Sequence, residues 1–461
     1  MASDRRSHQG GPHQGEPEPG GEPAAGPGSP QGEPEPETTR RRRIRSAVRQ
    51  LSFEAGGEDA TSLVEAREAA FVKEKEKQAA EREAERGADE SPRRVRLDSL
   101  EAAGFSPQSS RLWSFDRETE EELMEEMLLQ LAEMCGLPKM SALTVHTFVG
   151  RVAGHYSDEV DFHSFTHAVD VTLSAFLLLT RYGGREHLQP VDAMAILVAA
   201  MCHDAGHPGL TNPFQKATQS ELVSQYGEEA TLERMHISIG QSILRSPGCN
   251  VLDAAGFSAE EQAWASELIE FAVLGTDLST QSTVMAEWAE MFGDGGSAAG
   301  AEGAAASSCL CGFTMDAAAR KAVGRLLLKT ADLGCCAKPW AVAQHWAERL
   351  VRETQAQTAK ELELLVDTQG REAGSPVAGS AGAQAKFHQY VVTPIFRAAA
   401  AAFPAFSEGL EQALENERQW RCAHPLAGCT SSRSIDRGCA LTLMMAVGRA
   451  LSEAEGAEAA A

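Results

Sequence analysis

The apolar residues between positions 112 and 406 recur at spacings of three and four, the period of an α-helix that packs along one face. Few stretches in this part of the chain alternate at the period of a β-strand. Helix-capping residues fit the same pattern, because Ser258 stands before Glu260 and Glu261, and Gly206 follows an apolar run. The pattern therefore predicts an all-α domain. Eight segments carry the strongest helical signal: 123–131, 143–152, 171–179, 191–202, 232–244, 263–274, 322–332 and 340–350.

The two ends of the chain differ from this region in composition. Residues 1–60 are rich in Gly, Pro and Glu and should be disordered, because they hold too little apolar surface to offset their chain entropy. They include a basic arm, Arg40–Arg49, for which we weigh a solvated segment against docking to a protein or a membrane surface. We expect a charged helix or linker over residues 61–96. The main domain should follow over residues 97–425, and a C-terminal helix and tail over residues 426–461.

Charge and cysteine content narrow the class of protein. The chain has 461 residues and a formal net charge of −24, which argues against nucleic acid or an anionic membrane as the main partner. Its 10 cysteines have irregular spacing and no signal peptide precedes them, so we expect reduced thiols and a soluble, cytoplasmic protein. The longest apolar stretches fall short of the roughly 20 residues that a transmembrane helix needs.

Two histidine clusters suggest chemistry. His163 and His167 are four residues apart, so a helix would direct both side chains to one face. His203 and Asp204 form an adjacent pair at the end of an apolar run, where a solvated pair is out of place. Any one of these histidines alone fits a hydrogen-bonded core residue. Together they indicate a site for a divalent cation.

A further carboxylate completes the predicted site. Asp332 belongs to an apolar helix, and a buried aspartate there requires a cation or hydrogen-bond donors. His167, His203, Asp204 and Asp332 make a mixed nitrogen and oxygen ligand set that suits Zn²⁺. One carboxylate can bridge to a second, harder ion such as Mg²⁺ or Mn²⁺. A water between two such cations ionises near neutral pH and can attack phosphorus, so the sequence predicts a metal-dependent hydrolase.

Several ordered motifs resemble the class I 3′,5′-cyclic-nucleotide phosphodiesterases, members of the wider group of HD-type metal hydrolases. Residues 162–171 match the family's aromatic-His-Asn-x-x-His-Ala-x-Asp-Val except at Ser164, and residues 203–212 match its His-Asp-x-x-His-Pro-Gly-x-x-Asn at every fixed position. Leu-Glu-x-x-His is found at 232–236, Ala-Asp-Leu at 331–333, and Trp-x-Phe-Asp at 113–116. The resemblance covers roughly residues 110–405 and implies a compact multi-helix catalytic domain.

The resemblance assigns roles to several of these residues. It implies that His163 is the general acid that protonates the leaving O3′ and that a nearby carboxylate keeps it protonated. Asp204 would bridge the two metals, His207 would lie just outside the ligand set, and Glu233 would orient a water on the second metal. The implied activity is hydrolysis of cAMP, cGMP or both to the 5′-monophosphate, which ends cyclic-nucleotide signalling.

A base-binding pocket follows from the same resemblance. Gln384 aligns with the family's purine-binding glutamine, whose amide offers both a donor and an acceptor. Phe387 and Leu350 would hold the base between an aromatic face and a branched aliphatic side chain. The alternative is that Gln384 is an exposed polar residue and Phe387 a core phenylalanine, because the loop before them differs in length from the family's.

Departures from the family pattern leave two other functions open. Ser164 replaces an Asn beside the general acid, Gly334-Cys335-Cys336 replaces Ser-Asn-Pro, and Thr354-Gln355 replaces an aromatic pair. None of these changes removes a metal ligand. One alternative is a different HD-type nucleotide phosphohydrolase. The other is a catalytically degenerate homologue that binds cyclic nucleotide or a partner without turnover.

Overall fold

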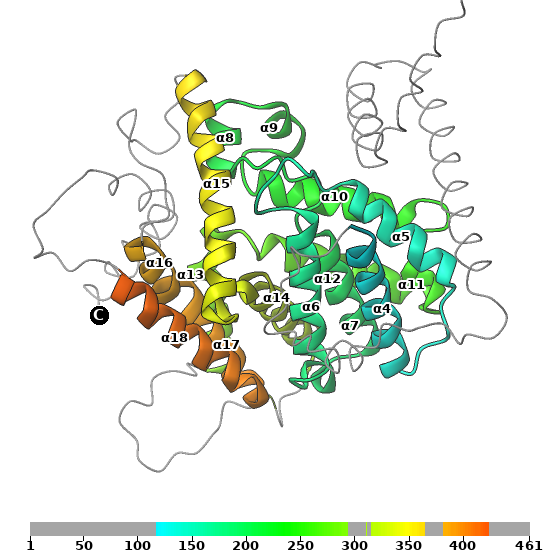
Figure 1. Ribbon diagram of the computed structural model, residues 1–461. Helices are drawn as coiled ribbons and strands as arrows, with labels where there is room; N and C mark the ends of the chain where they lie inside the picture. The colour runs from blue at the N-terminus through cyan, green and yellow to red at the C-terminus, as the bar shows by residue number, and fades with distance from the viewer. Residues whose placement is uncertain (1–116, 294–309, 311–314, 365–380, 424–461) are drawn as a thin grey trace, which may run out of the picture. The chain divides into compact units, whose positions relative to one another are not determined.

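The computed structural model describes residues 117–293, 310, 315–364 and 381–423, all within one compact unit (Figure 1). No strand occurs among these residues. The predicted disordered segment, basic arm, charged helix and C-terminal helix lie outside them, as does the Trp113–Asp116 motif. The longer helices are α4 (Arg117–Met134), α5 (Ala142–Gly154), α6 (Phe165–Leu179), α7 (Pro190–Cys202), α10 (Thr231–Arg245), α12 (Ala259–Leu274), α13 (Gln281–Phe292), α14 (Ala317–Asp332), α15 (Trp340–Leu364), α17 (Thr393–Ala402) and α18 (Ser407–Ala423).

The longer helices agree with the helical segments expected from the sequence, and short elements join them. Each of the eight predicted helical segments lies within one of the longer helices, so the predicted all-α fold is confirmed. None of the described helices combines the length and the apolar character that crossing a membrane would require. The short elements are η2 (Gly184–His187), α8 (Asn212–Ala217), α9 (Glu221–Tyr226), α11 (Val251–Ala254), η3 (Leu278–Thr280), η4 (Leu333–Ala337), α16 (Ala381–Phe387), the π-helical turn η5 (His388–Val392) and η6 (Pro404–Phe406).

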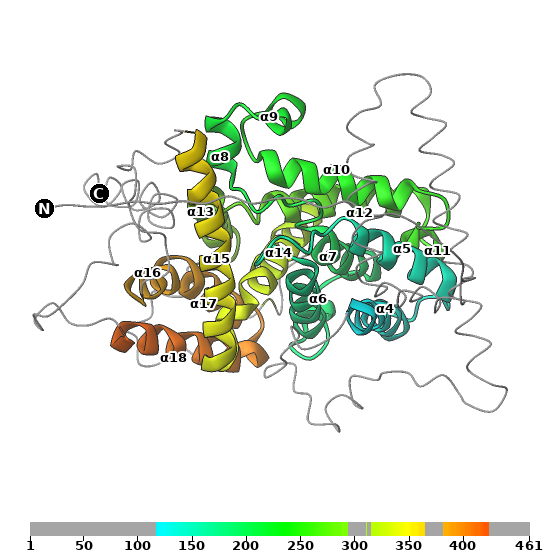
Figure 2. The same ribbon diagram turned by 45° about the horizontal axis from the view of Figure 1, so that its top comes forward.

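Helix α7 forms the centre of the core. Its sequence is apolar on every face, and all residues from Val191 to Cys202 are buried. It packs against α6, α12 and α14, and both views show these four helices gathered together (Figures 1 and 2). The end of α7 is therefore held firmly where the chain passes into His203 and Asp204.

The one acidic residue of α7 is fully paired. Asp192 is 0% exposed and accepts hydrogen bonds from Arg320 Nε and Nη2, at 2.7 and 2.6 Å, and from Trp264 Nε1, at 2.6 Å. It also accepts the backbone N–H of Gln189, which closes a capping box at the start of the helix. These contacts tie α7 to α12 and α14 and satisfy a charge that would otherwise destabilise the core.

The structure confirms a predicted helix cap and extends one helix into a glycine-rich segment. Ser258 caps α12, with its hydroxyl accepting the N–H of Glu261 and the Glu261 carboxylate accepting the N–H of Ser258, so this prediction is confirmed. Residues 381–383, in a segment rich in Ala and Gly, form the first turn of α16. Ala383 is buried there, because α16 packs against α18. Packing therefore extends the helix into a segment whose sequence is typical of a loop.

Candidate active site

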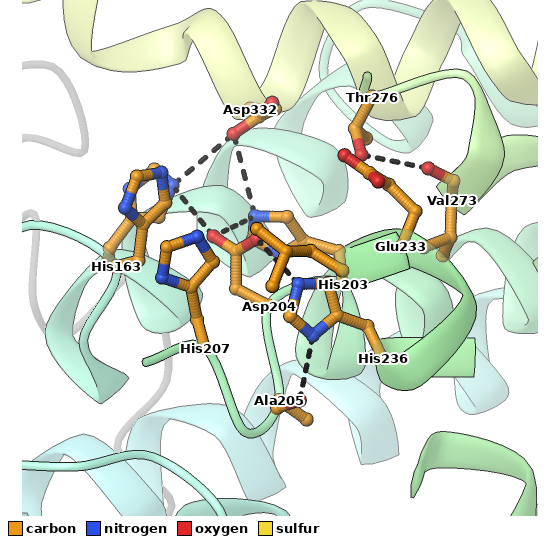
Figure 3. Close-up of polar contacts among 12 residues, drawn as sticks. His163, His203, Asp204, Ala205, His207, Glu233, His236, Val273, Thr276 and Asp332 are labelled. Carbon is orange, nitrogen blue, oxygen red and sulfur yellow. Dashed lines mark hydrogen bonds and ion pairs between the residues drawn. The ribbon is translucent and has the colours of Figure 1, made fainter. Parts of the chain in front are cut away.

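The four predicted metal ligands come together although they belong to three separate parts of the chain. His167 Nε2 lies 3.2 Å from Asp332 Oδ1 and 3.6 Å from Asp204 Oδ2. His203 Nε2 lies 3.0 Å from Asp204 Oδ2 and 3.4 Å from Asp332 Oδ1. Figure 3 shows Asp332 directed from α14 towards the histidine and aspartate that follow α7. Helix α6 contributes His167 from its first turn.

Two of the facing atoms of this cluster have no hydrogen-bond partner among the described residues and could bind a cation, while His167 Nε2 is hydrogen-bonded to Asp332 Oδ1. His167 and His203 are buried, and Asp204 is 8% exposed. His203 Nε2 and Asp204 Oδ2 have no hydrogen-bond partner in the described structure, although they are 3.0 Å apart. His203 donates from Nδ1 to the carbonyl of Ala200 at 2.9 Å, which leaves Nε2 for the cluster. Two imidazole nitrogens and two carboxylate oxygens thus fit a divalent ion at this position.

The charges within the cluster also favour a bound cation. Burial raises the pKa of Asp204, but His203 and His163 outweigh this and hold that pKa well below its ordinary value. The pKa of Asp332 is lowered in the same way by His167 and His203, against the effect of burial. Burial lowers the pKa of His203, yet the two carboxylates raise it well above its ordinary value. The site is therefore built to hold positive charge between two ionised carboxylates.

His163 lies beside this cluster and is paired with an acidic side chain. Its Nδ1 lies 2.5 Å from Glu353 Oε1, while Glu353 Oε2 accepts the backbone N–H groups of Phe162 and His163 at 2.7 and 3.0 Å. Burial lowers the pKa of His163, but Glu353 and Asp204 raise it to about 9. The imidazole is therefore protonated at neutral pH, as a general acid must be before it donates.

His207 and His236 continue this group of rings. His207 stacks on His163 with ring centroids 3.9 Å apart and an angle of 22°, and its Nδ1 accepts the N–H of Gly209. Burial and the charge of His163 hold the pKa of His207 well below its ordinary value, so this ring is neutral. His236 donates from Nδ1 to the carbonyl of Ala205 at 2.8 Å, and its Nε2 lies 3.8 Å from Asp204. Both rings support the loop that carries Asp204.

Glu233 stands at the edge of the site, at the start of α10 (Figure 3). Asn212 Nδ2 donates to one Glu233 oxygen at 2.9 Å, and Asn212 Oδ1 accepts the N–H of Leu232. Burial and the neighbouring Asp277 raise the pKa of Glu233 to about 7. A carboxyl group with this pKa can gain or lose a proton near neutral pH.

The predicted base-pocket residues occupy two helices. Gln384 and Phe387 lie three apart on α16 and are 8% and 9% exposed, so Gln384 is not the exposed polar residue of the alternative prediction, whereas Phe387 belongs to the hydrophobic core as that alternative expected. Leu350 is half-buried on α15. On that helix Arg349 donates to the Ser164 hydroxyl at 3.2 Å and to the carbonyl of Asp161. Ser164, which departs from the family motif, is thus held by Arg349 of α15.

Glu353 is the functional candidate that sequence reasoning did not identify. The buried face of α15 runs from Trp346 to Glu353, Gln357 and Glu361, at helical spacings of seven and four. This face begins apolar and then turns polar, which was the available signal. Gln357 accepts the backbone N–H of Thr211 at 2.9 Å, so α15 holds both histidine-bearing loops.

The chain resembles known proteins over this region. A family model described as 3′,5′-cyclic nucleotide phosphodiesterase matches residues 162–413. The 3′,5′-cyclic-nucleotide phosphodiesterase regA of Dictyostelium discoideum is 32% identical over 171 residues, which cover 36% of this chain and 21% of that protein. The 3′,5′-cyclic-AMP phosphodiesterase 4C of Mus musculus is 26% identical over 282 residues, covering 61% of this chain and 39% of that protein. The chain thus spans less than two thirds of either relative.

A solved structure shares the architecture. The phosphodiesterase domain of the RhoPDE fusion protein from the choanoflagellate Salpingoeca rosetta superposes with a TM-score of 0.59 at 25% sequence identity. The match covers 71% of this chain and 98% of that domain.

Proposed function

Because the chain belongs to the 3′,5′-cyclic nucleotide phosphodiesterase family, we propose that its helical domain hydrolyses a 3′,5′-cyclic nucleotide to the 5′-monophosphate. One observation carries this proposal. A protonated imidazole, His163 held by Glu353, lies beside His167, His203 and Asp204, which could hold a divalent cation, and Asp332 Oδ1 lies 3.2 and 3.4 Å from the two histidines. Opening a cyclic phosphodiester requires these two functions together, a proton for the leaving oxygen and positive charge at the phosphate.

We assign the metal ligands to His167, His203, Asp204 and Asp332. The distances of 3.0 to 3.6 Å between their facing atoms and the unpartnered Nε2 and Oδ2 atoms support this assignment. When bound, Zn²⁺ and a second ion, Mg²⁺ or Mn²⁺, would supply Lewis acidity, which lowers the pKa of water and offsets the phosphate charge. Asp204 would be the bridging carboxylate, since its second oxygen faces away from His203 towards His236.

His163 then acts as the general acid. Its proton goes to O3′ as the phosphorus–oxygen bond breaks, and Glu353 stabilises the imidazolium until that moment. Stacking on the neutral ring of His207 keeps the His163 plane fixed without adding a second positive charge. Glu233, with a pKa near neutrality and an amide donor from Asn212, would orient a water molecule on the second metal ion.

The nucleotide base would bind between α15 and α16. Gln384 supplies an amide that can pair with a purine edge, and Phe387 with Leu350 supplies apolar surface on its two faces. The mouse relative is described as a cyclic-AMP phosphodiesterase, and a Drosophila melanogaster relative with 27% identity as cGMP-specific. Both substrates are therefore to be tested.

A metal-controlled assay of the purified full chain tests this function. The protein is stripped with a chelator, reloaded with Zn²⁺ and Mg²⁺ or Mn²⁺, and assayed on cAMP, cGMP and a panel of linear nucleotides. We expect turnover of at least one cyclic nucleotide only after reloading. Turnover of linear nucleotides alone would favour another HD-type phosphohydrolase, and tight binding of cyclic nucleotide without turnover would favour a degenerate homologue.

Two variants separate the proton donor from the metal ligands. His163→Ala should keep its metal but lower kcat by roughly 10²- to 10⁴-fold, the usual contribution of general acid catalysis. Asp332→Ala should lose activity together with bound metal, because two imidazoles then face a single carboxylate. Metal content by elemental analysis distinguishes the two. A His163→Ala variant with near wild-type kcat would transfer the proton-donor role to another group.

A further inference from the structure

Two adjacent cysteines follow directly after the candidate metal ligand Asp332. Cys335 and Cys336 lie in η4 and carry free thiols, whereas no other cysteine in the described part of the chain has a cysteine neighbour in sequence. Both cysteines are buried, at 8% and 9% exposed, although less completely than Cys249 at 0%. Two thiols held side by side next to a catalytic site form a chemically distinctive group.

A buried histidine faces this pair. His388, the first residue of the π-helical turn η5, is 1% exposed, and its Nδ1 has no hydrogen-bond partner among the described residues. The Cys335 thiol and then His388 lower the pKa of Cys336, although burial opposes them. The pKa of Cys335 is raised by the Cys336 thiol and by burial. One thiol is therefore the nucleophile and the other remains protonated beside it.

The turn that carries the thiols is held tightly on both sides. Asn416 is 0% exposed and donates from Nδ2 to the carbonyls of Cys336 and Lys338, each at 2.8 Å. On the other side, a Cβ placed on Gly334 would lie 2.5 Å from the Ser174 hydroxyl, so η4 packs directly against α6. A change in the shape of this turn must therefore move either Asn416 or the end of α14.

We propose that Cys335 and Cys336 are an oxidation site: hydrogen peroxide converts the two thiols to a vicinal disulfide, and the disulfide lowers activity at the neighbouring site. The Cys336 sulfur attacks one peroxide oxygen, giving a sulfenic acid and one water. The Cys335 sulfur then displaces hydroxide from that sulfenic acid, which forms the S–S bond and a second water. The two thiols lose two hydrogens in total, and hydrogen peroxide is reduced to two waters.

Ring closure links this chemistry to the site. Adjacent Cα atoms are fixed about 3.8 Å apart across a trans peptide, so a disulfide between them closes a small ring through their peptide bond, which the helical backbone angles of η4 do not allow. The backbone of η4 must therefore rearrange, and Asp332 is the last residue of the helix from which η4 begins. Displacing Asp332 separates its carboxylate from His167 and His203. This effect on activity rests on the proposed function, whereas formation of the disulfide does not.

Peroxide treatment of the full-length, metal-loaded protein tests the proposal. The remaining thiols are alkylated in acid, and the peptide containing residues 335–336 is mapped by mass spectrometry. We expect this peptide to lose the mass of two hydrogens and to escape alkylation, with a more than fivefold fall in cyclic-nucleotide turnover that dithiothreitol reverses. Should the chain turn over no cyclic nucleotide, the peptide mass alone still decides whether the disulfide forms.

Single substitutions locate the effect. Cys335→Ser and Cys336→Ser, each compared with its own reduced state, should lose the peroxide response. The matched control Cys422→Ser removes an exposed lone thiol and should respond as the wild type does. The proposal is overturned if residues 335 and 336 stay fully alkylatable after activity is lost, if the disulfide forms with turnover unchanged, or if Cys422→Ser alone protects. The peptide mapping needs no variant, so a poorly folding substitution does not prevent the test.

Discussion

Replacing Glu353 with Gln asks whether this carboxylate is what keeps His163 protonated. Oε1 of Glu353 lies 2.5 Å from His163 Nδ1, and burial by itself lowers the pKa of that imidazole. With Glu353 present the pKa is about 9, so the charged form outnumbers the neutral form about 30 to 1 near pH 7.5. Glutamine keeps an acceptor oxygen for the backbone N–H groups of Phe162 and His163 but removes the charge. The pKa of His163 should then fall to its ordinary value of about 6.5 or below.

The consequence for activity follows from the sign of that shift. Catalysis needs the protonated imidazole, so activity is lost as pH rises through the pKa of His163. In Glu353→Gln the alkaline limb of the kcat profile should move down from about pH 9, and at pH 7.5 kcat should fall by about tenfold or more. Part of this loss should return near pH 6, because a larger fraction of the imidazole is charged there.

The assay is a pH series of initial rates with saturating cAMP or cGMP, together with metal content at each end of the series. Glu348→Gln is the matched control, since Glu348 is an exposed glutamate on the same helix and should leave the profile unchanged. Loss of activity in Glu353→Gln with no shift of the alkaline limb would mean that Glu353 acts only through the backbone it holds. An unchanged rate and an unchanged pH profile would show that Glu353 is not what keeps His163 protonated.

Other parts of the structure give separate predictions. Phe387→Ala and Gln384→Ala should each lower kcat/KM roughly 5- to 150-fold, a loss of about 1–3 kcal/mol of transition-state stabilisation, without loss of metal. Unchanged kinetics on both cyclic nucleotides would show that these residues do not bind the base. Asp192→Ala leaves the Arg320 guanidinium without its buried partner. The free energy of unfolding should fall by roughly 3–5 kcal/mol and the midpoint of thermal unfolding by about 5–15 °C. Glu267→Ala breaks the exposed ion pair with Lys321 and should lower the free energy of unfolding by less than about 1 kcal/mol. Equal falls in the melting temperatures of Asp192→Ala and Glu267→Ala would contradict this difference.

Local sequence accounts for the helices and for most of the cluster of candidate ligands. Helical periodicity is a property of neighbouring residues, so segments such as 191–202 and 322–332 could be predicted without knowing what covers them. His167 was recognisable from its spacing of four from His163, the pair His203-Asp204 from its place at the end of an apolar run, and Asp332 as a carboxylate in an apolar helix. The family motifs also depend only on short spacings, and the matched region 162–413 includes all of them except Trp-x-Phe-Asp at 113–116.

Tertiary structure decided which of these groups pair with one another. Glu353 lies 190 residues from His163, and Asp192 lies 128 residues from Arg320, so no local pattern connects either pair. In the sequence Glu353 is one glutamate among many on a charged helix, and only the packing of α15 against the histidine loops buries it beside His163. Periodicity fixes the direction of side chains around one helix axis, but distances between helices depend on how all the apolar faces pack together.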